Sequence, residues 1–224
     1  MVHHSKENAL TDREFELFIE AADKLEEYWS IQCKFLIFTL GRLGMRRGEV
    51  AHMKEEWVDW RRNMIEVPRQ QSCDKGINRE VCGYCTQLAK QRANYNEEIS
   101  LDEALDMCWS SKTDAAARDI YWGYDARVKL NIERFFDRFD KWEWSSGAIS
   151  RRVDKLEKHA SDELDSINIH PHALRATAAT HHAARGLEMH ALMQYFGWAQ
   201  PSTAELYLSR NGQNTARQLD TIHS

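Results

Sequence analysis

Three consecutive helices are predicted by residues 171–208, which read PHALRATAATHHAARGLEMHALMQYFGWAQPSTAELYL. Pro171 suits the first turn of a helix that runs to Gly186, because a proline start and a glycine stop are typical of helix ends. Two shorter helices are expected at Leu187 to Phe196 and at Pro201 to Leu208. The C-terminal third of the chain is therefore expected to be helical.

Helical periodicity also dominates the N-terminal part of the chain. Thr11-Asp12-Arg13-Glu14 matches a capping box and predicts an amphipathic helix over about 11–28. The apolar run from Ile31 to Leu43 is long enough for a buried helix rather than a strand, and this helix is expected to end near Gly41 or Gly44. A short helix is expected over 46–54. Further helices are predicted over 126–139, about 147–160 and about 212–222.

Two short strands are predicted among these helices, over 63–68 and 117–122, and Pro68 ends the first of them. We therefore expect a mainly α-helical fold with a small antiparallel β-sheet (α+β), in one domain that covers residues 1–224. About 50 residues separate the two strands, and a loop of that length needs structure of its own or a metal. We refer to residues 70–111 as the insert.

The insert contains four of the five cysteines of the chain. Cys82 and Cys85 form a Cys-x-x-Cys pair, and with Cys73 they have a spacing that suits tetrahedral zinc. A fourth ligand is needed, for which Cys108 is the candidate in the sequence. The alternative is that these thiols are free and pack the insert. Cys33 lies in the apolar helix and is expected in the core.

The composition limits the class of protein. No run of about 18 apolar residues and no apolar signal region occurs, so we expect a cytoplasmic protein without a membrane span. An odd number of cysteines without a secretory signal argues against a disulfide scaffold. The formal charge of −5 argues against a uniformly basic nucleic-acid binder, but the acid is local. Residues 1–30 hold eight acidic and three basic side chains, and residues 94–111 hold five acidic and none basic.

Five short motifs follow one another along the chain. They are Gly44-Met45-Arg46-Arg47-Gly48-Glu49-Val50, Ser111-Lys112-Thr113, His172-Ala173-Leu174-Arg175, Gly197-Trp198, and Tyr207 nine residues after Trp198. In this order they resemble the tyrosine recombinase (phage integrase) family, with its arginine box, β-hairpin lysine, His-x-x-Arg box, Gly-His or Gly-Trp turn and tyrosine. The resemblance covers about residues 10–215. The insert and the sequence around His172 look most like archaeal, particularly haloarchaeal, integrases.

The resemblance implies site-specific cleavage and rejoining of DNA strands. Tyr207 would be the nucleophile, and its 3′-phosphotyrosine product would conserve the bond energy, so the chemistry requires no cofactor. A tyrosine pKa of about 10 means that attack at neutral pH needs a base and nearby cations. Arg46 and Arg175 would present planar forks to the phosphate oxygens. Glu49, one helical turn from Arg46, is expected to orient that arginine.

Three further residues have roles implied by the same resemblance. His172 would donate to the phosphate or move the proton, and Trp198 would donate through its indole N–H. Lys112 would protonate the leaving 5′-oxygen, with Lys75 as an alternative between the same strands. His170 is expected at the surface, and the remaining histidines of the C-terminal third, His181, His182 and His190, are expected to be structural or solvated.

The implied partner is double-stranded DNA with an attachment-type site, bound by a homotetramer in which residues 212–224 could dock on a neighbour. Because only about ten residues precede the match, we expect the family's N-terminal core-binding domain to be absent and DNA affinity to be weak and salt-sensitive. The acidic segments are expected to lie away from the DNA. Two alternatives remain, a non-catalytic DNA-binding or regulatory derivative and a zinc-stapled interaction module.

Overall fold

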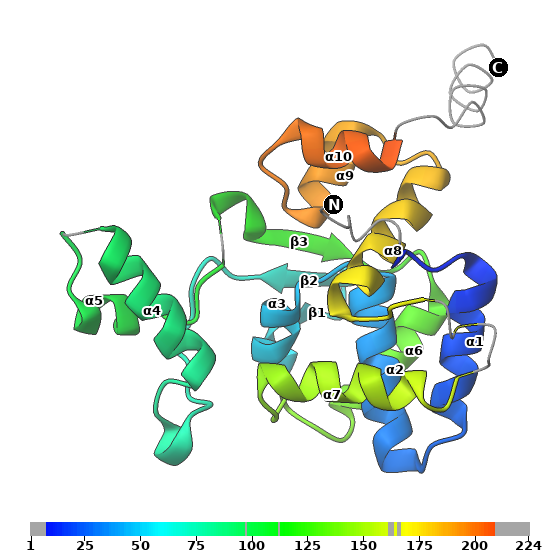
Figure 1. The fold of residues 1–224 in the computed structure, drawn as a ribbon, viewed down its shortest axis with the longest axis horizontal. Helices are drawn as coiled ribbons and strands as arrows, with labels where there is room; N and C mark the ends of the chain where they lie inside the picture. Colours follow the sequence, from blue (N-terminus) through cyan, green and yellow to red (C-terminus); the bar gives the residue numbers. More distant parts are fainter. Residues whose placement is uncertain (1–7, 97, 112, 161–163, 165–166, 209–224) are drawn as a thin grey trace.

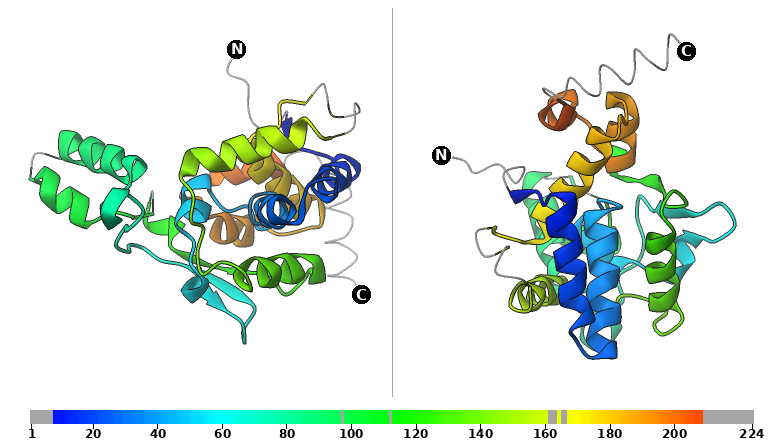
Figure 2. Two further views of the ribbon diagram at one scale, coloured as in Figure 1. Left: turned by 90° about the horizontal axis from the view of Figure 1, so that it is seen from below. Right: turned by 90° about the vertical axis from the view of Figure 1, so that its right-hand side faces the viewer.

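The protein has a helical body, a small sheet on one side of it, and a helical insert that projects outward (Figures 1 and 2). The structure, a computed structural model, describes residues 8–96, 98–111, 113–160, 164 and 167–208. The predicted mainly α-helical fold with a small antiparallel sheet is confirmed. In this described part of the chain, no helix is long and apolar enough to cross a membrane.

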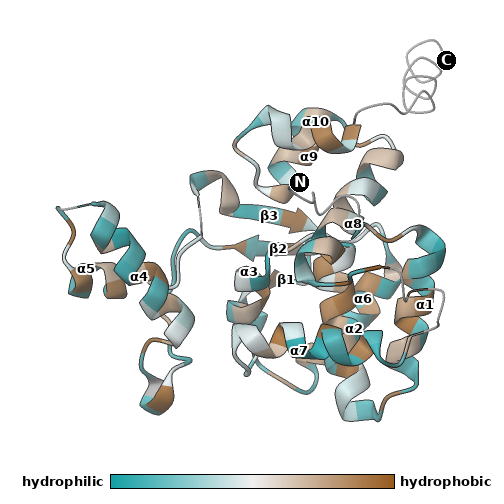
Figure 3. Cartoon of the chain, in the orientation of Figure 1, coloured by the Kyte–Doolittle hydropathy of each residue, from teal (hydrophilic) through white to brown (hydrophobic). Residues whose placement is uncertain are grey.

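Helix α2 (Glu27–Gly41) is the centre of the body. Its apolar side chains are buried, and Phe35 stacks on Phe135 with ring centroids 3.8 Å apart. Figure 3 shows the hydrophobic residues concentrated on α2 and its neighbours. The helices packed around α2 are α1 (Asp12–Asp23), α6 (Ala126–Phe136), α7 (Ser146–Glu157) and α8 (Pro171–Ala184). The apolar run at 31–43 is therefore the core helix. This helix begins earlier than predicted, and it ends at Gly41, one of the two predicted ends.

The capping box at the start of α1 is present. The Glu14 amide donates to Thr11 Oγ1 at 3.3 Å, and the Thr11 amide donates to Glu14 Oε2 at 2.7 Å. The helix ends at Asp23 and not near residue 28, because the chain turns there and Glu27 begins α2. The two predicted helices are consecutive antiparallel neighbours in the body (Figure 2).

The sheet has three antiparallel strands in the order β1-β2-β3, namely Val58–Asp59, Met64–Val67 and Arg118–Tyr121. Ile65 pairs with Ile120 in the centre, and both side chains are buried. Asn63, with φ 54°, makes the left-handed turn that joins β1 to β2. The two predicted strands are confirmed. Strand β1 was missed because it has only two residues.

The insert leaves the sheet between β2 and β3 and forms a lobe of its own (Figure 1). It contains helix α4 (Gly83–Tyr95) and helix α5 (Leu101–Asp106), preceded by a 3-10 turn. Its two ends run side by side, since the Ser111 amide donates to Arg69 O at 3.0 Å. A few side chains fill its interior, namely Cys73, Cys85, Ala89, Ala104, Cys108 and Trp109.

The C-terminal third forms three helices as predicted. Helix α8 is followed by α9 (Met189–Phe196) and α10 (Pro201–Leu208), which lie above the sheet in Figure 1. Gly197 ends α9 in the left-handed conformation, with φ 63°. The helix predicted at about 212–222 lies outside the described residues.

Candidate active site

Arg46 lies directly before helix α3 (Arg47–His52), and Glu49 fixes it there. The Arg46 amide donates to Glu49 Oε2 and its Nη1 donates to Oε1, both at 2.8 Å. Arg46 Nη2 donates to the Gly197 carbonyl at 2.6 Å. The expected orientation of Arg46 by Glu49 is therefore present in the geometry, and a second anchor comes from the end of α9.

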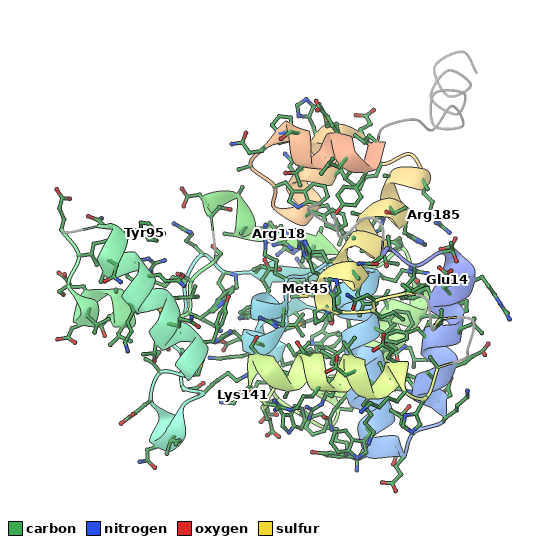
Figure 4. All side chains as sticks on the ribbon, in the orientation of Figure 1. Glu14, Met45, Tyr95, Arg118, Lys141 and Arg185 are labelled. Carbon is green, nitrogen blue, oxygen red and sulfur yellow. The ribbon has the colours of Figure 1, made fainter. Side chains whose placement is uncertain are left out.

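Glu49 also pairs with Arg118, a residue that the sequence reasoning did not select. Arg118 lies on β3, below helices α9 and α10 in Figure 4, and both side chains of the pair are almost fully buried. Burial by itself would raise the pKa of Glu49. The charge and hydrogen bonds of Arg118, with the charges of Arg175 and Arg46, outweigh burial and lower this pKa to about 2. Glu49 is therefore a fixed anion for three guanidinium groups.

Arg175 lies on the buried side of α8, with 5 % of its surface exposed. Its Nη1 donates to the Gly44 carbonyl, and its Nη2 donates to the Phe196 carbonyl at 2.6 Å. Burial lowers the pKa of Arg175, Arg46 acts in the same direction, and Glu49 opposes both. A guanidinium keeps its proton even so, which makes Arg175 a permanent cation held mainly by neutral carbonyls.

Two glycines allow these carbonyls to approach the arginines. Gly44 has φ 60°, and a Cβ there would lie 2.1 Å from Phe196 Cε1. Gly197 has φ 63°, and a Cβ there would lie 2.7 Å from Ala115 O. Only glycine can adopt these positive φ angles at such close contacts, and this explains why both motifs contain a glycine at these positions.

Four of the predicted catalytic residues line one cavity of about 850 Å³, namely Arg46, His172, Arg175 and Trp198. His172 is exposed on the first turn of α8. Arg47 also lines the cavity, whereas the described lining residues include no Asp or Glu. The cavity therefore has a positive wall that suits an anion.

Tyr207, on α10, is linked to this cavity through Trp198. The two rings stack with centroids 5.2 Å apart and planes 9° apart, and Trp198 stacks in turn on Phe196 at 4.8 Å. Burial raises the pKa of Tyr207, and the charge of Arg175 opposes this. The phenol is therefore neutral near pH 7 and close enough to Arg175 to feel its charge.

Lys112 lies outside the described residues, but the next residue, Thr113, lines the cavity. Lys75 lies elsewhere. Its Nζ donates to the carbonyls of Ala51, Trp142 at 2.6 Å and Trp144 at 2.8 Å. Lys75 therefore fastens the insert to the body, and the structure does not support it as the alternative general acid.

The remaining histidines of the C-terminal third each contact a neighbouring segment or solvent. His170 caps α8, since its Nδ1 accepts from the Ala173 amide at 3.2 Å. His181 contacts Asp12 Oδ1 at 3.0 Å, and His182 Nε2 donates to the Arg42 carbonyl at 2.9 Å. His190 is exposed on α9. The positions of His181, His182 and His190 agree with the structural or solvated roles expected for them. His170, which was expected at the surface, is instead half-buried, and it lines the cavity as well as capping α8.

Three of the predicted metal ligands lie together, but the fourth neighbour is not the predicted one. Cys73, Cys82 and Cys85 surround His52, and the four ligand atoms lie within 4.8 Å of one another. The Cys108 thiol instead donates to the carbonyls of Cys85 and Ala104, both at 3.4 Å. The geometry corrects Cys108 to His52, which sequence spacing could not indicate because His52 precedes the insert.

Comparison with known proteins identifies relatives for most of the chain. The model of the phage integrase family matches residues 8–214. The tyrosine recombinase XerC of Shewanella sp. strain W3-18-1 is 30 % identical over 69 residues, which are 31 % of this chain and 23 % of that protein. XerC of Shewanella amazonensis is 32 % identical over a segment of the same size. The matched segment is thus about a quarter of each curated relative.

Solved structures share the fold at low sequence identity. The XerA recombinase has a TM-score of 0.59 and 19 % identity, over 96 % of this chain and 64 % of that one. The Tn1549 transposon integrase in complex with transposon right end DNA has a TM-score of 0.63 and 15 % identity, over 96 % of this chain and 66 % of that one. This chain therefore spans about two thirds of each of those chains.

Proposed function

Because this chain belongs to the phage integrase family, we propose that it cleaves and rejoins DNA strands at a specific site through a 3′-phosphotyrosine intermediate. One observation carries the proposal: Arg46, Arg175, His172 and Trp198 line a single cavity, and Tyr207 stacks on its Trp198 wall. These residues come from four separate segments of the sequence. Their convergence supports a phosphate site beside a tyrosine nucleophile.

Charge balance favours a phosphate as the ligand of this cavity. Arg46, Arg118 and Arg175 share one carboxylate, that of Glu49, which is buried beneath them. The surplus positive charge of this cluster attracts an anion, and two guanidinium forks suit the oxygens of a phosphodiester. As a pentacoordinate phosphorane forms and negative charge develops, both contacts strengthen and lower the barrier.

Proton transfer requires groups other than the arginines. Tyr207 is neutral at rest, so its phenol must lose a proton as it attacks phosphorus. Both His170 and His172 line the cavity, and His172 is the one that the motif order selects to accept this proton directly or through water. The Trp198 indole would donate to a phosphate oxygen and keep water out. The role of Lys112 as acid for the leaving 5′-oxygen rests on its place in the motif order.

Several finer points extend the proposal to the whole protein. The Tn1549 integrase and the XerH recombinase are solved in complex with DNA, which supports double-stranded DNA with an attachment-type site as the partner. We expect a tetramer on that DNA, with residues 212–224 docking on a neighbour, and a cytoplasmic location. Integration of a viral or mobile element in an archaeal host follows from the motif resemblance alone, since the curated relatives here are bacterial.

A suicide-substrate assay tests the proposal. A pool of 5′-labelled duplexes with a randomised core and a nick downstream of it releases a short 5′-hydroxyl fragment on cleavage, so the covalent adduct is trapped. Wild type should retain label on the protein after denaturation, and sequencing of the trapped strands gives the site. Tyr207→Phe should retain none, whereas Tyr95→Phe, exposed on α4, should match wild type. An adduct that survives in Tyr207→Phe contradicts the assignment.

A further inference from the structure

We propose that His52, Cys73, Cys82 and Cys85 bind one Zn²⁺ that fastens the insert to helix α3, the helix that carries the catalytic arginine box. This site is separate from the proposed strand-cleavage chemistry. Its ligands come from two parts of the chain: His52 from the end of α3, and three cysteines from the start of the insert.

The distances fit a tetrahedral zinc. Nε2 of His52 lies 3.6 Å from Cys73 Sγ, 3.7 Å from Cys82 Sγ and 3.2 Å from Cys85 Sγ. Zinc bonds of about 2.3 Å to sulfur and about 2.0 Å to nitrogen, at tetrahedral angles, place nitrogen and sulfur about 3.5 Å apart. Hydrogen bonding explains such a cluster poorly, because Nε2 offers either one proton or one lone pair to three sulfurs.

The second ring nitrogen of His52 fixes the form of the imidazole. Nδ1 lies 2.8 Å from the Gly48 carbonyl, and a carbonyl only accepts, so Nδ1 carries the proton. The Nε2 lone pair therefore points at the three sulfurs. A hydrogen bond from the far nitrogen to a backbone carbonyl is the usual support of a metal-binding histidine. Trp109 stacks on the same ring at 5.4 Å and holds its plane.

The thiol groups are placed to be thiolates. Cys82 is the N-cap of α4 and Cys85 is in its first turn, where the helix dipole stabilises negative charge. The Cys82 amide donates to Cys73 Sγ at 3.5 Å, a contact that favours an anionic sulfur. Three thiolates and one imidazole form a soft donor set that suits zinc.

Burial indicates a structural rather than a catalytic metal. His52, Cys73 and Cys85 are buried and Cys82 is half-buried, so four protein ligands complete the coordination without water. The insert itself has a small apolar interior, and a metal compensates for such a core by linking its loop to the body. The hydrogen bonds of Lys75 to carbonyls of the body fasten the same loop.

The position of this metal site would affect the geometry of the active site. His52 is the last residue of the six-residue helix α3, which Arg46 directly precedes and whose first turn contains Glu49. Trp109, on the imidazole, is three residues before Lys112. Zinc would thus hold the returning segment of the insert, at Trp109, in a fixed position relative to the arginine box.

Metal analysis of the full chain tests this site without any DNA. Protein purified under reducing conditions should contain about one zinc per chain by mass spectrometry. Cobalt added to zinc-depleted protein should give thiolate-to-metal charge-transfer bands and the intense visible bands of tetrahedral coordination. Purified protein with no zinc, or cobalt spectra without thiolate bands in wild type, overturns the proposal whatever the variants do.

Variants then assign the ligands. His52→Ala and Cys82→Ser should lose stoichiometric zinc, and His52→Cys should restore it as a four-thiolate site. Cys108→Ser, which keeps a hydroxyl donor for the carbonyls of Cys85 and Ala104, is the matched control and should retain zinc. Loss of zinc in Cys108→Ser with retention in His52→Ala would overturn the ligand set. The zinc tests are independent of the strand-cleavage test. If zinc-free wild-type protein still cleaves DNA, the proposed function stands, and the zinc site is judged by the metal analysis alone.

Discussion

Arg118 and Glu49 form a bidentate ion pair that is almost fully shielded from solvent. Arg118 Nη1 lies 2.9 Å from Glu49 Oε1, and Nη2 lies 3.1 Å from Oε2. Arg118 Nε also donates to the Tyr195 carbonyl at 2.7 Å. One side chain thus ties the sheet to the arginine box and to α9, and so relates three of the segments that build the cavity.

Replacing Arg118 by alanine should destabilise the protein strongly. The change leaves the Glu49 carboxylate buried with one partner fewer, and breaking a buried pair typically costs about 3–5 kcal/mol. Denaturant unfolding measures the change in free energy. Arg127→Ala is the matched control, since Arg127 makes the same bidentate contact with Glu16 at 2.9 Å on the surface. That loss should be at most about 1 kcal/mol, and equal losses would contradict the role given to burial.

The Glu49 pair should also appear in the pH dependence of stability. The pKa of the Glu49 carboxyl falls from an ordinary value near 4.5 to about 2 in the folded protein. Its stabilisation is therefore complete above the unfolded pKa and is lost as the pH falls toward 2. Each pKa unit corresponds to about 1.4 kcal/mol, so protonation of Glu49 should remove about 3 kcal/mol from the free energy of unfolding.

Unfolding curves of wild type and Glu49→Gln between pH 7 and pH 2 measure this contribution. The variant should be less stable at pH 7, and the two free energies should converge as the pH falls. Glu157→Gln, an exposed carboxylate on α7, should follow wild type at every pH. A constant difference between wild type and Glu49→Gln would mean that the carboxylate titrates normally.

Gly44 should tolerate no side chain. Alanine there must adopt φ 60° and meet the Phe196 ring, so strain and steric overlap act together. We expect Gly44→Ala to lower the free energy of unfolding by more than about 2 kcal/mol. Gly147→Ala, on α7 with no heavy atom closer than 3.4 Å to the new Cβ, should be neutral or stabilising. Thermal unfolding of both variants checks the difference.

The sequence was sufficient for the elements whose signals are local. The capping box at Thr11, the apolar run of α2 and the proline start of α8 depend on neighbours within a turn or two, and all three occur in the structure. The motif order likewise selected Arg46 and Arg175, which the fold brings to one cavity.

Contacts between residues that are far apart in the sequence cannot be predicted from such local signals. Arg118 is 69 residues from Glu49, and His52 is 21 to 33 residues from the three cysteines. The sequence favours Cys108 as the fourth ligand because it is the remaining cysteine of the insert. The fold instead brings a helix of the body to the insert, which no spacing rule encodes.

Lysine cannot replace either cavity arginine if the planar fork is what binds phosphate. Arg46 uses its two terminal nitrogens on Glu49 and Gly197, and Arg175 uses its own on two carbonyls, so each guanidinium is already fixed in plane before DNA binds. A lysine ammonium keeps the charge but has one nitrogen, which cannot hold these anchors and a phosphate in the same geometry.

Arg46→Lys and Arg175→Lys should therefore lower the rate of covalent adduct formation by about 10²–10³-fold, with DNA affinity changed far less. Arg62→Lys, on the exposed turn beside Asp59, serves as the control and should leave the rate unchanged. Equal losses of affinity and rate in the cavity variants would instead assign these arginines to ground-state DNA binding.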